Sequence, residues 1–334
     1  MVSRSVVAAA LMGAALLLRS VDASAACSLK TMEVPVTMEG HSPLVAGKIN
    51  GQPVKLLLDS GAFFSLIDAK FAAQQKLRPV ARPEIGTRLG PAAETLTTGA
   101  GGSGRVAGIV VASTFEFAGA KFTGVPFLTF NFGSASGILG QNFLHQLDNE
   151  YDLRNGVMRL VRPEDCGAAE LAYWVKSGMT YSVTPLESTG GINAHTVAMI
   201  TINGVKMRAY FDTGASTTFI TARAAARAGV KTSDPGVKPA GYTRGIDRDN
   251  IKTWIGRFSS VKIGDEEIKN TLLAIGDSNP DDFDVLVGAD FFLAHHVYVA
   301  NSQRKLYFSY NGGWVFNVPQ PDAAAASDDT HAAR

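Results

Sequence analysis

Short runs of apolar residues, several of them alternating with polar ones, recur along the chain. The clearest begin at Val34 (VPVTM), Val54 (VKLLLD), Gly108 (GIVVAST), Val157 (VMRLV), His195 (HTVAMITI), Val261 (VKIG) and His296 (HVYVA). Asn-Gly pairs separate such runs, at Asn50-Gly51, Asn155-Gly156, Asn203-Gly204 and Asn311-Gly312. Runs of this length with Asn-Gly turns between them are typical of β-strands and hairpins. The pattern predicts an all-β protein.

Helical spacing of apolar residues is confined to two short segments. One is DAKFAAQQKL from Asp68, and the other is ARAAARAG from Ala222. Both are rich in alanine, which favours helix. We therefore expect short helices added to a β fold.

The chain contains an internal repeat with an offset of 212 − 59 = 153 residues. It aligns LLLDSGAFFSLID, from Leu56, with AYFDTGASTTFIT, from Ala209. Ten positions of the first copy have identical partners in the second: Ile49, Asn50, Gly51, Asp59, Gly61, Ala62, Ile67, Ala69, Ala72 and Ala73. Later in each copy, GILGQNFL and VLVGADFF share an apolar-apolar-Gly step. A repeat of this length indicates a duplicated lobe rather than a solenoid.

The length of 334 residues suits two such lobes. We place the first lobe at 26–161 and the second at 186–318, with an interlobe linker at 162–185 where the strand rhythm breaks. The tail at 319–334 is rich in Pro, Ala and Asp, and its composition predicts disorder.

The N-terminal 25 residues have the pattern of a secretory signal peptide. Arg4 precedes an apolar run from Val6 to Leu18, and Ala23-Ser24-Ala25 forms a small-x-small cleavage site. Retention as a membrane anchor is the alternative, but the run is shorter than the roughly 20 residues that a spanning helix needs. We expect a periplasmic or secreted protein with residues 1–25 removed.

Cys27 and Cys166 are the two cysteines of the chain. In an exported protein, two cysteines are readily interpreted as one disulfide, which here would tie the N-terminal strand to the interlobe linker. Two free thiols are the alternative.

The repeated turns, Asp59-Ser60-Gly61-Ala62 and Asp212-Thr213-Gly214-Ala215, resemble those of the aspartic peptidases, most closely the retropepsin-like branch. The downstream steps, Ile138-Leu139-Gly140 and Leu286-Val287-Gly288, strengthen the resemblance. The resemblance implies two β-barrel lobes fused in one chain and related by a pseudo-twofold axis, with each lobe contributing one Asp. It also implies a monomer that is an intramolecular pseudo-dimer.

Two such aspartates brought close together have a defined chemistry. Carboxylates about 3 Å apart share one proton, so one of them serves as acid and the other as base. A water molecule held between Asp59 and Asp212 would then attack a peptide carbonyl without a covalent adduct.

Other residues of the turns have supporting roles in this interpretation. Ser60 and Thr213 are expected to fix the two turns through hydroxyl-to-backbone bonds. Gly61 and Gly214 are expected to let backbone amides approach the carboxylates. Phe63 is a departure, because the second lobe has a small polar residue, Ser216, at that position and first-lobe subsites must differ in shape.

A flap that closes over the substrate is expected in the sequence between each Asp and the downstream glycine. In the first lobe the glycine-rich segment TTGAGGSGRVAG lies where the family's flap belongs, with Gly101, Gly102 and Ser103 as candidates for substrate contact. In the second lobe the corresponding segment, AGYTRGIDRDN, contains Tyr242.

Other interpretations have weaker support. Residues 99–104 match G-x-G-x-x-G, but no apolar strand precedes them and no helix pattern follows, so a dinucleotide site is not expected. His295 and His296 are adjacent and on a strand would point to opposite faces, which argues against a metal site. With 31 Lys and Arg against 30 Asp and Glu, the charge balance does not suggest nucleic-acid binding.

The sequence therefore predicts an aspartic endopeptidase that acts on peptides or proteins through Asp59 and Asp212, with no metal or cofactor. The alternative is an inactive peptide-binding protein that retains the cleft. Intact Asp-Ser/Thr-Gly turns in both halves favour the enzyme, because a binding protein does not need both carboxylates.

Overall fold

The computed structural model describes most of the chain between Cys27 and Phe316. The described residues are 27–80, 97–99, 102–104, 108–131, 137–189, 194–244, 250–278, 280 and 282–316. The predicted signal peptide, the predicted tail and Gly101 lie outside them. Among the described helices, none is long and apolar enough to cross a membrane.

Six strands of the first half form a closed barrel. In spatial order they are β2 (Ser42–Ile49), β3 (Gln52–Leu58), β10 (Gly137–Leu139), β4 (Leu66–Asp68), β9 (Ala120–Phe130) and β8 (Gly108–Phe117). The barrel closes because β8 also pairs with β2, where Ile49 lies opposite Phe115. The short strand β5 (Arg78–Pro79) extends β8 at the edge.

The second half repeats this barrel strand for strand. The order is β14 (Val197–Ile202), β15 (Val205–Phe211), β20 (Val285–Val287), β16 (Phe219–Thr221), β19 (Glu266–Gly276) and β18 (Asn250–Ile263). Pairing of β18 with β14 closes it, and β17 (Lys238–Arg244) lies outside β18. The predicted all-β fold with two similar lobes is confirmed.

The segments predicted to be helical form helices α1 (Ala69–Gln74) and α4 (Ala222–Arg227). Each begins after a capping side chain: Asp68 accepts hydrogen bonds from two backbone N–H groups of α1, and Thr221 accepts one from α4. Each of the seven apolar runs predicted as strands lies wholly or mostly on a strand. Two further short helices, α3 (Gln141–Leu144) and α5 (Ala289–Ala294), follow the apolar-apolar-Gly steps.

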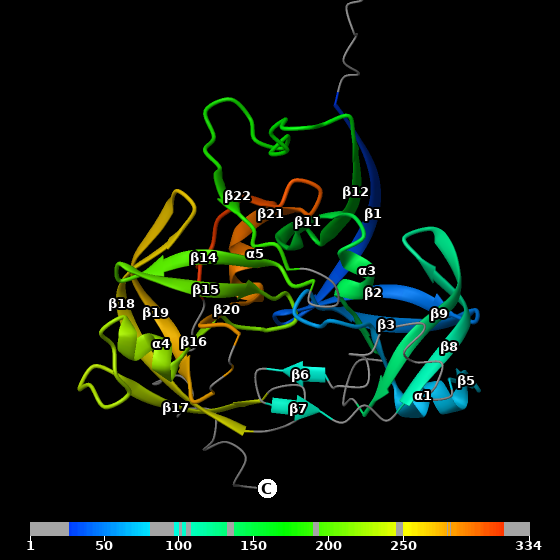
Figure 1. Ribbon diagram of the computed structural model, residues 1–334, viewed down its shortest axis with the longest axis horizontal. Coiled ribbons are helices and arrows are strands. Elements are labelled where there is room, and N and C mark those ends of the chain that lie inside the picture. Colours follow the sequence, from blue (N-terminus) through cyan, green and yellow to red (C-terminus); the bar gives the residue numbers. More distant parts are fainter. Residues whose placement is uncertain are drawn as a thin grey trace, which may run out of the picture.

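A third set of strands joins the two lobes. Its order is β13 (Ser182–Pro185), β22 (Lys305–Tyr310), β21 (His295–Ala300), β11 (Asp148–Asp152), β12 (Val157–Glu164) and β1 (Ser28–Glu39). Pairing of β11 with β21 connects the first lobe to the C-terminal strands. Figure 1 shows this interlobe sheet at one end of the molecule, with β17 and the hairpin of β6 (Thr97–Gly99) and β7 (Gly102–Gly104) at the other.

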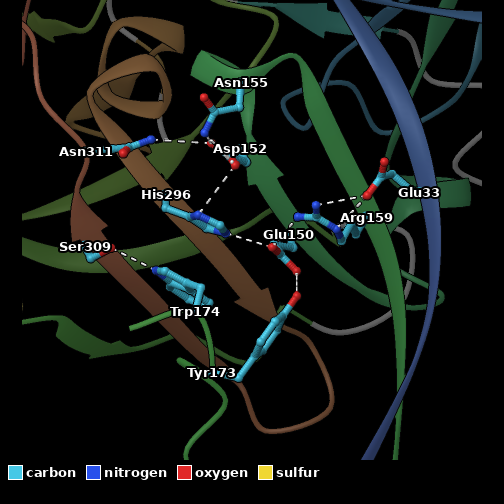
Figure 2. A network of polar contacts seen from close by, with 10 residues as sticks. All are labelled: Glu33, Glu150, Asp152, Asn155, Arg159, Tyr173, Trp174, His296, Ser309 and Asn311. Atoms are coloured by element: carbon cyan, nitrogen blue, oxygen red, sulfur yellow. Dashed lines mark hydrogen bonds and ion pairs between the residues drawn. The ribbon is translucent and has the colours of Figure 1, made fainter. Parts of the chain in front are cut away.

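A buried carboxylate, Glu150 of β11, is the centre of a polar network on the interlobe sheet (Figure 2). It accepts hydrogen bonds from His296 Nε2 at 2.8 Å, from Arg159 Nη1 at 2.7 Å and from the hydroxyl of Tyr173. Arg159 also pairs with Glu33 of β1. Since His296 comes from the C-terminal strands and Tyr173 from the linker, one carboxylate ties three parts of the chain together.

The ring of His296 is held on its other sides as well. It stacks on Trp174 with ring centroids 4.4 Å apart, and its Nδ1 lies 3.8 Å from Asp152. Trp174 in turn donates to Ser309 of β22 at 2.9 Å. The linker is thereby fixed against β21 and β22.

A disulfide joins Cys27, just before β1, to Cys166, just after β12. The two strands are already paired at this end, where Ser28 lies opposite Glu164. The disulfide therefore ties the N-terminus of the described chain to the start of the linker.

Replacing Cys27 and Cys166 together by Ser should lower the free energy of unfolding by about 2–4 kcal/mol, because the crosslink restricts the unfolded chain across a long loop. Urea unfolding of the oxidised wild type and of the double variant measures this loss. Equal stability of the two proteins would show that the crosslink does not form, as would two alkylatable thiols in the purified wild type.

Candidate active site

Asp59 directly follows β3, whose last residue lies against the central strand of the barrel wall. Leu58 pairs with Leu139 of β10, and the backbone N–H of Asp59 donates to the Leu139 carbonyl at 3.1 Å. The apolar-apolar-Gly step thus forms the strand that fixes the start of the Asp turn.

Asp212 is placed in the same way in the second lobe. Phe211 of β15 pairs with Val287 of β20, and the N–H of Asp212 donates to the Val287 carbonyl at 2.8 Å. The two aspartates therefore occupy equivalent positions of the two barrels.

The side chains of Ser60 and Thr213 connect the two turns reciprocally. Ser60 Oγ accepts from the N–H of Thr213 at 2.9 Å and donates to the carbonyl of Phe211 at 2.9 Å. Thr213 Oγ1 accepts from the N–H of Ser60 at 3.1 Å and donates to the carbonyl of Leu58 at 2.7 Å. Both side chains are buried, so the four bonds lock the turns together.

Glycine is required after each of these residues. A Cβ atom added to Gly61 would overlap the carboxyl group of Asp212, and one added to Gly214 would overlap that of Asp59. Each turn thus lies in contact with the aspartate of the other lobe, which brings the two carboxyl groups together.

Backbone N–H groups point at these carboxyl groups. Asp59 Oδ1 accepts from Gly61 at 2.9 Å and from Ala62 at 2.8 Å, while Asp212 Oδ1 accepts from Gly214 at 2.8 Å. The N–H of Gly61 also lies 3.1 Å from Asp212 Oδ1, so a single donor is shared between the two lobes.

The pKa values of both aspartates are raised. Removal from water raises the pKa of Asp59 well above its ordinary range, and the charge and hydrogen bond of Asp212 raise it further. Removal from water also raises the pKa of Asp212, against the lowering effect of its hydrogen bonds. A pair with this behaviour retains one shared proton above the pH at which isolated aspartates ionise.

Asn142 and Asp290, two residues after the Gly of each apolar-apolar-Gly step, accept hydrogen bonds from the chain that follows each Asp turn. In the first lobe, Asn142 Oδ1 accepts from the N–H and the hydroxyl of Ser65. In the second lobe, Asp290 accepts from the N–H and the hydroxyl of Thr218, at 3.0 and 2.6 Å. The Asn or Asp shared by the two repeats therefore holds the chain just beyond each turn.

Gln141 is a site residue that the sequence interpretation missed. It is 3% exposed, and its Nε2 donates to the carbonyl of Ser60 at 2.8 Å and lies 3.5 Å from Thr196 Oγ1 of the second lobe. The signal was its place directly after Gly140, where the second repeat has Ala289 after Gly288.

Phe63, the departure from the repeat, contacts the other lobe. Its ring centroid lies 3.9 Å from that of His195, and burial lowers the pKa of this histidine to about 4. At the equivalent position of the second lobe, the Ser216 carbonyl lies 2.9 Å from Nδ1 of His41. Each turn is thus contacted by a histidine from the opposite lobe, although the two contacts differ in chemistry.

The predicted flap residues that the structure describes lie on two strands, β7 and β17. Gly102 and Ser103 lie on β7, which pairs with β6, whereas Gly101 is outside the described residues. Tyr242 lies on β17 and is 69% exposed. Their contact with a substrate stays a prediction.

The adjacent histidines of β21 have separate partners. His295 lies 3.1 Å from both carboxylate oxygens of Glu266, and its Nδ1 lies 2.8 Å from the carbonyl of Phe291. His296 faces Glu150. Among the described residues, no group of three His, Cys, Asp or Glu side chains has the arrangement of a metal site.

Comparison with known proteins places the chain among proteases. The model of the aspartyl protease family matches residues 45–143 and 198–291, which together are more than half of the chain. A search of curated proteins gives no match. The aspartic proteinase from Irpex lacteus matches with 13% identity and a TM-score of 0.51, covering 86% of this chain and 100% of its own.

A retropepsin-like aspartic protease from Rickettsia conorii matches with 21% identity and a TM-score of 0.31, covering 40% of this chain and 92% of its own. The two matched segments of the family model each contain one Asp-Ser/Thr-Gly turn and one apolar-apolar-Gly step. The chain belongs to the aspartyl protease family, with two retropepsin-like lobes in a single polypeptide.

Proposed function

We propose that the protein is an aspartic endopeptidase that hydrolyses peptide bonds with a water molecule activated between Asp59 and Asp212. One observation carries the proposal: the two carboxyl groups share the N–H of Gly61, which lies 2.9 Å from Asp59 Oδ1 and 3.1 Å from Asp212 Oδ1. The family match supports a peptide substrate.

The chemistry needs one proton on the pair. The ionised carboxyl group takes a proton from water as the water oxygen attacks the carbonyl carbon of the peptide, and the protonated group donates to the carbonyl oxygen. The tetrahedral intermediate then collapses: the C–N bond breaks, the leaving nitrogen takes the proton that the first carboxyl group received from water, and the second carboxyl group takes a proton back from one of the two hydroxyl groups. The products are a carboxylic acid and an amine, and the pair again holds one proton.

Cleavage of a peptide library, followed by mass spectrometry across a pH series, tests the proposal. We expect a bell-shaped rate profile, falling on the acid side where both carboxyl groups are protonated and on the alkaline side where both are ionised. Because removal from water raises the pKa of Asp59, the alkaline limb should lie above the ordinary aspartate pKa. A chelator should leave the rate unchanged.

Two outcomes would contradict this function. Loss of cleavage with a chelator would indicate metal-dependent hydrolysis instead. Absence of cleavage by the wild type at every pH, with retained peptide binding, would favour an inactive peptide-binding protein with the same cleft.

We also propose that the protein acts after export, in the periplasm or outside the cell. The N-terminal sequence, with Arg4, the run from Val6 to Leu18 and the site at Ala23-Ser24-Ala25, supports this. The bond between Cys27 and Cys166 suits an oxidising compartment. N-terminal sequencing of protein from an exporting host should find Ala26 first, whereas an intact Met1 would contradict export with cleavage.

A further inference from the structure

The peptide unit between Ser60 and Gly61 has partners at both of its ends. Its N–H, on Gly61, lies 2.9 Å from Asp59 Oδ1 and 3.1 Å from Asp212 Oδ1. Its carbonyl oxygen, on Ser60, accepts a hydrogen bond from Gln141 Nε2 at 2.8 Å. The N–H that both carboxyl groups share and the carbonyl that accepts from Gln141 therefore belong to the same planar peptide unit.

Gln141 is itself firmly placed. Its backbone N–H donates to the carbonyl of Ala62 at 2.8 Å, and its side chain is buried with Nε2 also facing Thr196 of the second lobe. Rotation of the Ser60–Gly61 peptide would break a buried hydrogen bond and leave the amide of Gln141 unsatisfied, which is costly.

The second lobe lacks this support. Ala289 occupies the equivalent position, and its backbone N–H donates to the carbonyl of Ala215 at 2.7 Å, but its methyl side chain cannot donate to the Thr213 carbonyl. The corresponding N–H, on Gly214, bonds to Asp212 in its own lobe. Gln141 thus supports the first-lobe turn by a contact that Ala289 cannot make in the second lobe.

We propose that Gln141 is a positioning residue, which orients the Ser60–Gly61 peptide so that its N–H bridges the two catalytic carboxyl groups and stabilises their singly ionised state. This inference rests on the proposed function. A peptide whose carbonyl accepts a hydrogen bond is also a stronger N–H donor, because linked hydrogen bonds polarise one another. Gln141 acts through this peptide and does not touch the substrate.

The test replaces Gln141 by Met, which has a similar length but no donor. We expect kcat to fall about tenfold with KM within about twofold, because the turn is misplaced while the cleft is retained. The acid limb of the kcat profile should move to higher pH by about half a pH unit, since a weaker N–H bond favours the protonated pair.

Titration of ¹³C-labelled aspartate carboxyl groups by NMR reads the pair without any substrate. The Q141M variant should show the same upward movement for the dyad, whether or not a cleavable peptide has been found. Failure of the wild type to cleave peptides would reject the proposed function, and this titration would still decide the role of Gln141.

Three further variants sharpen the result. Q141A, which copies the residue of the second lobe, serves if Q141M folds poorly by circular dichroism. Q141E should recover activity only at acid pH, where a protonated carboxyl group can donate to Ser60. Q146M is the matched control, because Gln146 donates to the carbonyl of Asn142 at 2.7 Å from an exposed position, and it should behave as wild type.

Wild-type kcat, acid limb and carboxyl titration in both Q141M and Q141A would overturn the inference. So would an equal loss in Q146M, or full activity of Q141E at the pH where its side chain is ionised.

Discussion

Replacing either Asp59 or Asp212 by Asn should reduce peptide cleavage by on the order of 10³-fold or more, because an amide can neither accept the proton of the water nor cycle between acid and base. The structure gives both residues equivalent strand positions, with Asp59 after β3 beside β10 and Asp212 after β15 beside β20. We therefore expect both single variants to be inactive rather than one of them impaired.

Initial rates on a peptide found with the wild type measure the effect, and peptide binding should survive. D234N is the matched control: Asp234 caps a turn through the N–H of Lys231 at 2.7 Å, so the same substitution there should leave the rate unchanged. Wild-type cleavage by D59N or D212N would rule out the two-carboxylate mechanism.

The same variants should be more stable than the wild type at neutral pH. Because the pKa values of Asp59 and Asp212 are raised by folding, the folded chain binds a proton more tightly than the unfolded chain does. The ionised pair therefore costs stability at neutral pH, and this cost disappears as the pH falls through the raised values. Asn removes the cost, so the melting temperature of each variant at pH 7 should rise.

The geometry of the two Asp turns could be predicted from sequence because it depends on short local patterns. Asp, Ser and Gly are favoured in turns, and the repeat of Asp-Ser/Thr-Gly indicates that the chain makes the same turn twice. The apolar-apolar-Gly step reads as a buried strand, and the structure places Leu139 and Val287 against the residues before each Asp. That the two turns face each other was predicted only from the family resemblance.

The interlobe sheet could not be predicted in this way. The segment Asp148–Asp152 has the sequence DNEYD, which reads as a polar loop, yet all five residues are buried on β11. Its carboxylates find partners such as His296 and Ser302 that lie far along the chain. Periodicity tells which face of a strand is buried, but it does not tell which distant side chain satisfies a buried charge.

Gln141 escaped prediction for the same reason. Glutamine side chains are mostly exposed, and only the structure shows that the amide of Gln141 donates to the carbonyl of Ser60 and faces Thr196. The difference from Ala289 was visible in the repeat, but its meaning depends on a contact with the preceding turn.

Replacing Glu150 by Ala should destabilise the protein by about 3–5 kcal/mol, because Arg159, His296 and Tyr173 would lose their common buried acceptor. The loss should exceed that of E164A, since Glu164 forms an exposed ion pair with Lys30, and such pairs contribute about 1 kcal/mol or less. Urea unfolding at pH 7 compares the two variants. Equal losses would show that the network does not join the lobes.

The E150Q variant removes the charge of Glu150 and keeps the shape of its side chain, so it tests the contribution of the charge alone. Burial alone would raise the pKa of Glu150, but hydrogen bonds from His296 and Tyr173 and the charges of His296 and Arg159 outweigh it and lower the pKa. A carboxylate with a lowered pKa stabilises the fold above the ordinary value of 4.5 and loses this contribution as the pH falls through its folded pKa.

The Asp59–Asp212 pair changes stability with pH in the opposite direction, so the pH dependence of wild-type stability alone is a sum of both effects. The difference in unfolding free energy between wild type and E150Q should therefore shrink from pH 5 to pH 3. A difference that stayed constant over this range would mean that Glu150 has the same pKa in the folded and the unfolded chain, and a difference that grew as the pH fell would mean that folding raises its pKa; either result would contradict the three bonds.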